Sequence, residues 1–280
     1  MTTARVLSAD ATTTHQPTPQ TSGRAGTMSL LASEIVWSTK IFLRNPIGVL
    51  FALVLPMFFL VLFNVLTDRG ELYDGLPFVQ WNLAGITVFV VASSCFINLA
   101  IATVFSREAG TLRRMRSTPL PPGVYVLSRV LTNSLVALFS TLLMVFVAWA
   151  VFGLQLKPLP AIAGLLALLV GVLAYSALGM AVANIVPTQE TSIPIVMFLS
   201  FPLLFAAGVF FPLEGAPQAL ITAMDLMPVR PFGMALQQAL DPATSGLAIA
   251  WQELGVLAAW GLLGTFLASR FFRWEPRGSG

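Results

Sequence analysis

The feature that most constrains the fold is a short basic segment between two long apolar runs. Residues 105–122, FSREAGTLRRMRSTPLPP, hold four arginines and one glutamate, whereas only 10% of the chain is charged. The flanking runs, about residues 82–105 and 125–152, are each long enough to cross the roughly 30 Å hydrocarbon core of a bilayer as a helix. Because short loops rich in Lys and Arg stay in the cytoplasm, the segment predicts a cytoplasmic loop between two membrane-spanning helices.

The composition indicates the same class of protein. Of the 280 residues, 56% are hydrophobic, and an ordinary soluble domain has about 25% charged residues. The formal net charge of +3 does not indicate a nucleic-acid partner, because the basic residues lie beside apolar runs. The single Cys95 and single His15 exclude an intrachain disulfide and a Cys/His metal site. We therefore predict an all-α membrane protein.

The N-terminal region has two parts. Residues 1–27 are rich in Thr, Gln, Pro and Ser without apolar periodicity, which predicts a disordered cytoplasmic tail. Residues 28–45 repeat apolar side chains at helical spacing, with Trp37 among them. This helix either lies in the membrane interface or packs against the cytoplasmic ends of the spans. Residues 274–280 form a second predicted cytoplasmic tail.

The apolar runs predict six membrane-spanning helices. The first contains Pro56, so we expect a kink where neighbouring groups satisfy the freed carbonyl. Residues 213–246 are broken by prolines yet too apolar for a solvated loop, which predicts outer re-entrant helices; an ordinary surface loop is the alternative. With both termini cytoplasmic, only Arg69, Lys157 and Arg230 of the 15 Lys and Arg lie outside, as topology rules require. The spans are expected at about 47–66, 82–105, 125–152, 161–186, 193–211 and 247–271.

Several side chains within the spans are candidates for a substrate pathway, because polar groups in a membrane are costly and often functional. Asn98 and Asn133 either line such a pathway or join neighbouring helices by hydrogen bonds. Glu253, near the outer end of the last span, either has a function or is solvated at the interface. Gly179 and Ala183 form a small-xxx-small pair that favours close helix packing. The candidate pathway residues are Asn98, Asn133, Phe201, Phe205, Phe211 and Glu253.

The basic segment is also the natural docking point for a partner. This chain has neither a GxxxxGK[ST] loop nor an HExxH motif, so uphill transport would draw on a separate nucleotide-hydrolysing subunit. Ser106 can cap a short helix whose apolar residues recur every three positions. The alternative is that the arginines only set topology or contact anionic lipid. The predicted coupling residues are Arg107, Glu108, Ala109, Leu112, Arg113, Arg114, Met115, Arg116 and Pro119.

Three features together resemble a known family: the helix at 28–45, the segment REAGTLRRMRSTPLPP, and FPLLFAAGVFFPLEGAP followed by MPVRP. The sequence resembles the permease subunits of type-two ATP-binding-cassette exporters, and in particular the bacterial daunorubicin-resistance class of drug-efflux permeases. The resemblance makes residues 28–273 the permease domain. It implies a dimer with a second copy or a paralogue in a bacterial plasma membrane. It also implies a coupling helix at 107–119 and an outer gate at 211–246.

The resemblance implies export of a hydrophobic or amphipathic compound, either drug or lipid-like. This chain would bind no cofactor itself, since ATP and Mg²⁺ bind to the partner ATPase. A lipid or polysaccharide exporter of the same architecture is one alternative. A membrane scaffold or sensor that transports nothing is another, and an intramembrane enzyme that uses Glu253 with Asp225 is a third.

Overall fold

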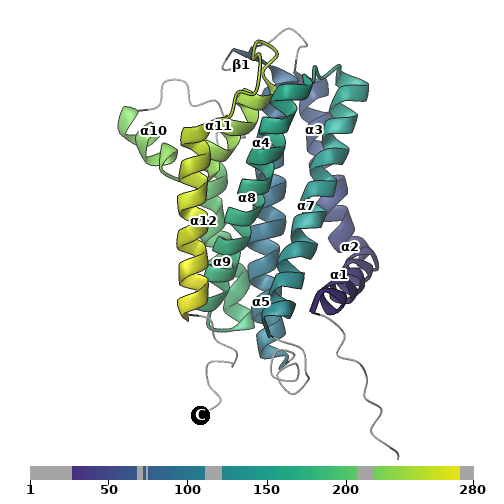
Figure 1. The fold of residues 1–280 in the computed structure, drawn as a ribbon, viewed down its shortest axis with the longest axis vertical. Coiled ribbons are helices and arrows are strands. Elements are labelled where there is room, and N and C mark those ends of the chain that lie inside the picture. Colours follow the sequence, from purple (N-terminus) through teal and green to yellow (C-terminus); the bar gives the residue numbers. More distant parts are fainter. Residues whose placement is uncertain (1–26, 68–71, 74, 111–121, 207–216, 272–280) are drawn as a thin grey trace, which may run out of the picture.

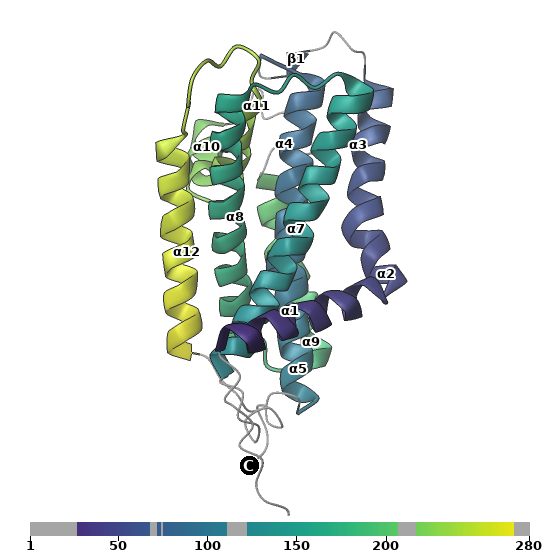
Figure 2. The same ribbon diagram turned by 45° about the vertical axis from the view of Figure 1, so that its right-hand side comes forward.

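The protein is an elongated helical bundle. The computed structural model describes residues 27–67, 72–73, 75–110, 122–206 and 217–271. Long helices run side by side between its two ends (Figure 1), and α1 lies across one end (Figure 2). The last turn of α12 lies at the same end as α1. The elements are α1 (Thr27–Leu43), α2 (Pro46–Val49), η1 (Leu50–Val54), α3 (Leu55–Leu66), β1 (Leu72–Tyr73), β2 (Leu76–Pro77), α4 (Phe78–Val91), η2 (Ala92–Asn98), α5 (Leu99–Glu108), α7 (Pro122–Phe152), α8 (Pro158–Ile185), α9 (Gln189–Ala206), α10 (Gln218–Asp225), α11 (Val229–Leu240) and α12 (Trp251–Phe271).

Four helices among the described residues are long and apolar enough to cross a membrane. They cover Pro46–Leu66, Phe78–Glu108, Val126–Phe152 and Pro158–Ile185, and they coincide with the first four predicted spans. Helices α9 and α12 lie where the fifth and sixth spans were predicted. A total of six spans therefore stays a prediction. The predicted tails fall almost wholly outside the described residues.

Helix α8 is the centre of the bundle, and small residues bring its neighbours close. It packs against α12, α11, α5 and η2. A Cβ atom built on Gly179 would lie 2.7 Å from the carbonyl oxygen of Cys95 and 2.9 Å from that of Phe96, both in the backbone of η2. Ala183, one turn further, is fully buried. The Gly179/Ala183 pair thus permits the close backbone approach that the sequence predicts.

The expected irregularity at Pro56 takes the form of a π-helical segment. The five residues of η1 directly precede α3 and its proline. Proline has no N–H, so it cannot donate to the carbonyl four residues earlier, which belongs to Ala52. That carbonyl accepts a hydrogen bond of 2.8 Å from Ser140 Oγ on α7. A neighbouring helix thereby satisfies the freed group, as the sequence predicts.

The proline-rich region before α12 contains the short helices α10 and α11. Helix α11 packs against α8, α4 and α12, and its Phe232 is fully buried. The Phe232 ring lies 5.9 Å from that of Tyr175 on α8 and occupies the space beside Gly171, where a Cβ atom would come within 2.5 Å of the ring. The backbone of α11 is therefore buried in protein, which a re-entrant helix requires. Re-entry into a membrane remains a prediction, and residues 207–216 lie outside the described part of the chain.

Candidate functional site

The predicted coupling segment begins at the end of α5. Arg107 and Glu108 are the last residues of this helix, and the chain leaves it at Gly110, whose φ of +68° is readily adopted only by glycine. The expected helix cap at Ser106 is wrong, because α5 continues through this residue to Glu108. Ala109 follows as an exposed residue. The other predicted coupling residues lie outside the described residues: Leu112, Arg113, Arg114, Met115, Arg116 and Pro119.

Arg107 points into the protein. Its side chain is only 4% exposed. Its Nη1 donates to the carbonyl of Ala183 at 3.0 Å, and its Nη2 donates to the carbonyl of Val186 at 2.6 Å and to that of Pro187 at 3.5 Å. Because α8 ends at Ile185 and its C-cap Val186 is extended, the Ala183 carbonyl has no donor within the helix, and the Arg107 guanidinium supplies one.

This arrangement fits the electrostatics of a helix end. The carbonyls of the last turn have no partner within the helix, and the negative end of the helix dipole favours a cation. Hydrogen bonds from a charged donor contribute about 1.5–3 kcal/mol each, which offsets much of the cost of burying the guanidinium. The hydrogen bonds of Arg107 therefore connect the end of α5 to the end of α8.

The turn that follows α8 is held by its own hydrogen bonds. The hydroxyl of Thr188 lies 3.0 Å from that of Thr191 and accepts from the backbone N–H of Thr191 at 3.4 Å, which caps the start of α9. The buried Ser192 hydroxyl donates to the carbonyl of Gln189 at 2.6 Å. Helix α9 also packs against α5. The ends of α5 and α8 and the start of α9 thus form one compact cluster.

Asn98 and Asn133 meet each other. The Nδ2 of Asn98, the last residue of η2, donates to Oδ1 of Asn133 on α7 at 2.9 Å. Asn133 in turn donates from Nδ2 to the carbonyl of Arg129 at 2.9 Å. Asn133 is buried, whereas Asn98 is exposed at the surface of the chain. The geometry is that of an interhelical hydrogen bond, next to a π-helical segment of the kind that often marks functional sites.

A second pair of asparagines was missed by sequence reasoning. Asn64 on α3 donates from Nδ2 to Oδ1 of Asn82 on α4 at 3.0 Å and to the carbonyl of Leu60 at 2.8 Å. Both asparagines are buried. The sequence does carry a signal for this pair: each of two consecutive apolar runs contains an asparagine, and consecutive membrane-spanning helices lie antiparallel to each other. One amide pair therefore joins α3 to α4, and another joins η2 to α7.

The remaining predicted pathway residues are dispersed. Phe201 on α9 is 56% exposed, the side chain of Phe205 and all of Phe211 lie outside the described structure, and Glu253 is half-buried in the first turn of α12. Asp225, weighed as an enzymatic partner of Glu253, forms an ion pair of 3.2 Å with Arg230. Asp225 is thus paired with a cation of α11.

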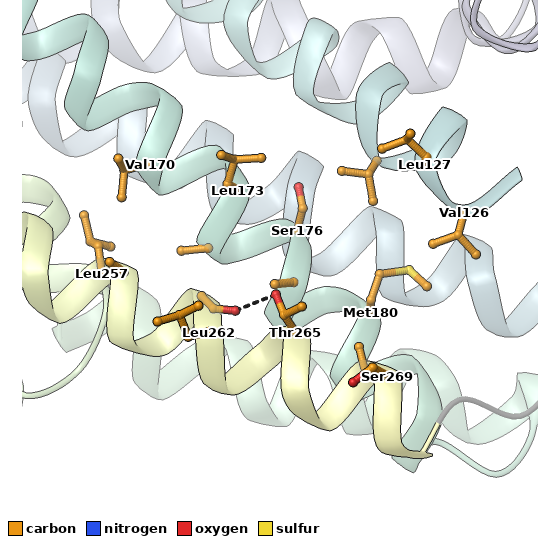
Figure 3. A pocket seen from close by; sticks show the side chains of 16 residues that line it. Val126, Leu127, Val170, Leu173, Ser176, Met180, Leu257, Leu262, Thr265 and Ser269 are labelled. Atoms are coloured by element: carbon orange, nitrogen blue, oxygen red, sulfur yellow. Dashed lines mark hydrogen bonds between the residues drawn. The ribbon is translucent and has the colours of Figure 1, made fainter. Parts of the chain in front are cut away.

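An apolar groove of about 840 Å³ lies between α7, α8 and α12 (Figure 3). Its lining includes Ala174 and Gly261, where α8 and α12 approach so closely that a Cβ atom on Gly261 would lie 3.2 Å from Cα of Ala174. The hydroxyls of α12 bond to their own helix, with Thr265 Oγ1 donating to the carbonyl of Gly261 at 2.8 Å and Ser269 Oγ to that of Phe266 at 2.9 Å. The lining includes the first turns of α7 and the last turns of α12, so the groove lies toward the end of the bundle where α1 crosses. The groove therefore offers mainly apolar contacts to a bound molecule.

Among the described residues, no three His, Cys, Asp or Glu side chains gather in a group that would hold a metal ion. Long apolar helices that pack through small residues and interhelical amide pairs are those of a multi-pass membrane protein. The chain belongs to the ABC-2 family of transporter permeases, because the model of this family, described as "ABC-2 family transporter protein", matches residues 63–270. Permeases of this family normally work with an ATPase subunit.

Two relatives carry names of the same kind. The chain is 25% identical over 246 residues to a Bacillus subtilis (strain 168) protein named "Putative transport permease YvfS", covering 88% of this chain and 98% of that protein. It is 26% identical over 187 residues to a Cyanophora paradoxa protein named "Putative transport permease ycf38", covering 62% of this chain and 61% of that protein. Both names are consistent with a transport subunit that is not an enzyme.

Proposed function

We propose that this chain is the membrane permease subunit of an ATP-driven exporter that moves a hydrophobic or amphipathic compound outward. The observation that carries the proposal is the family match over residues 63–270, in a chain without a nucleotide-binding loop of its own. ATP and Mg²⁺ would bind to a separate ATPase subunit. The daunorubicin-resistance class is the finer assignment, and it rests on the sequence motifs.

The proposed topology has six spans, with α9 and α12 as the fifth and sixth. The basic residues support an orientation with α1 and the end of α12 at the cytoplasmic face of a bacterial plasma membrane. In this orientation the segment after Gly110 faces the ATPase, and α10 with α11 forms an outer gate. A second copy or a paralogue completes the pathway.

The apolar groove supports a hydrophobic or amphipathic substrate. Among the described residues, the lining holds only three hydroxyls, those of Ser176, Thr265 and Ser269, and the last two already bond to backbone carbonyls. It therefore has little to offer the many hydroxyls of a sugar. A polysaccharide exporter is therefore disfavoured relative to an exporter of drugs or lipids. The groove's volume of about 840 Å³ falls within the roughly 300–1,000 Å³ range of small-molecule sites.

The test is ATP hydrolysis by the co-purified permease–ATPase complex in proteoliposomes. Daunorubicin and a fluorescent phosphatidylethanolamine are the two probes, each also followed for ATP-dependent movement across the membrane. We expect one probe to stimulate hydrolysis and to be transported. A bulky change at an exposed position of the groove, Ala258→Phe, should reduce both signals. Ala259→Phe, at the next exposed position of the same helix and outside the groove lining, is the control. Hydrolysis that neither these probes nor a wider panel alters would favour a scaffold or sensor.

A further inference from the structure

Arg107 occupies an unusual position for a residue next to a docking segment. It lies three residues before Gly110, where the chain turns out of α5 into the basic segment, yet its guanidinium is buried against the last carbonyls of α8. The acceptors exist because α8 ends at Ile185 and its C-cap Val186 is extended, so the last carbonyls have no donor within the helix. The arginine and the carbonyls at the end of α8, up to 80 positions apart in the chain, form one contact.

The contact connects the basic segment to the centre of the bundle. Helix α8 packs against α11 and α12 as well as α5, and the turn after it leads within three residues into α9. A displacement of the end of α5 that moved α8 would therefore also move α11 and α12, which extend toward the end of the bundle opposite α1 (Figure 1). Arginine suits this role, because its planar group holds two carbonyls in fixed directions, which a single ammonium group does not.

We propose that Arg107 is a positioning residue that transmits movement of the basic segment to α8 and α9, and that it does not itself contact the ATPase. The inference rests on the proposed function, in which that segment docks on an ATPase. It makes the end of α5, the end of α8 and the start of α9 one rigid unit. Loss of Arg107 should therefore leave ATPase binding in place and uncouple the permease from it.

The experiment measures distances between pairs of spin labels in the permease–ATPase complex. Cys95 is the only cysteine, so a Cys95→Ala background accepts new cysteines at chosen sites. One pair, Phe105→Cys with Glu190→Cys, spans the contact between α5 and α9. The second pair, Glu190→Cys with Leu43→Cys, reports movement of α9 against α1. All three positions are exposed, and each pair is measured without nucleotide and with ATP and vanadate.

In the wild-type background we expect the first distance to be narrow and unchanged by nucleotide, and the second to shift. With Arg107→Gln, the ATPase should still co-purify, while the first distance broadens and the nucleotide-driven shift of the second is lost. Arg107→Lys should be intermediate. Arg44→Gln, which changes an exposed arginine near α2, is the matched control and should behave like the wild type.

A second variant covers the case in which Arg107→Gln does not fold. Arg107→Lys keeps the positive charge at the end of α8 but replaces the planar guanidinium with a single ammonium group, which cannot hold two carbonyls in fixed directions. It should weaken the nucleotide-driven shift. If Arg107→Gln, or Arg107→Lys where the former does not fold, keeps both distances and the shift, transmission through Arg107 is refuted. A wild-type complex that shows no shift contradicts the proposed function itself and removes the transmission with it.

Discussion

The first span and the second span differ more in burial than in composition. In the apolar stretch of Phe78–Glu108, 56% of the residues are buried in the protein, against 17% in that of Pro46–Leu66. The first span is nevertheless the more apolar of the two. Since lipid tails are as apolar as a protein core, hydropathy alone does not tell a helix that faces lipid from one that faces protein.

What distinguishes the buried helices is the presence of small and polar residues at their contacts. Gly179 lets the backbones of α8 and η2 touch, and Asn133 bonds to the end of η2. The outer face of the first span instead carries large exposed side chains such as Phe58, 54% exposed, and Val65, 69% exposed. This comparison predicts a graded series of mutational effects, largest in the core around α8 and smallest on the first span.

The largest effect is expected for Phe232→Ala. The change empties the space beside Gly171 and removes the ring that lies 5.9 Å from Tyr175. Truncating a fully buried phenylalanine costs about 3–5 kcal/mol of unfolding free energy. The measurement is unfolding of the purified protein in detergent by a denaturant titration. Met234→Ala on the exposed side of α11, 39% exposed, is the control, and equal losses for both would show that α11 is not anchored by Phe232.

Gly179→Ala should follow, with a loss of about 1–3 kcal/mol from overpacking, because the new Cβ would meet backbone atoms that cannot move independently. Gly255→Ala has the opposite expected sign. Its Cβ meets nothing within 4 Å, so the higher helix propensity of alanine should stabilise α12 by at most about 1 kcal/mol. The same titration measures both variants. A neutral Gly179→Ala would contradict the close packing of α8 on η2.

The Asn98–Asn133 pair should have a smaller effect. A double-mutant cycle with Asn98→Ala and Asn133→Ala should give a coupling energy of about 0.6 kcal/mol, and at most about 1.7 kcal/mol, as for other interhelical hydrogen bonds in membranes. Transport by each variant is measured in parallel. If transport falls far more than stability while the coupling energy is near zero, these residues serve a substrate pathway and the packing interpretation is wrong.

The smallest effect is expected for Phe58→Ala on α3. Its side chain is 54% exposed, and surface changes usually stay within about 0.5 kcal/mol of unfolding free energy. The informative measurement is the oligomeric state by light scattering in detergent. A shift from dimer to monomer with unchanged stability would identify the first span as the contact with a second copy. A stability loss as large as that of Phe232→Ala would overturn the comparison between the two spans.

The sequence predicted the positions of the long helices well, because runs of apolar residues between charged segments are a strong signal. It predicted that a neighbour would satisfy the carbonyl freed by Pro56, but not that Ser140 would be the donor. It assigned Arg107 to the docking surface, since a charge next to other arginines resembles an exposed residue. The burial of Arg107 depends on the free carbonyls at the end of α8, which only the fold brings beside it. The same holds for Asn64 and Asn82.

The central claim is that a separate ATPase docks on the basic segment after Gly110. The most direct test is a pull-down of the tagged permease from solubilised native membranes, comparing the wild type with a Leu112→Asp, Arg113→Glu double variant and an Arg44→Glu control. We predict that an active ATPase co-purifies with the wild type and the control and is lost from the double variant. If no ATPase accompanies the wild type under conditions that preserve complexes, the exporter account is contradicted, and the arginines only set the topology.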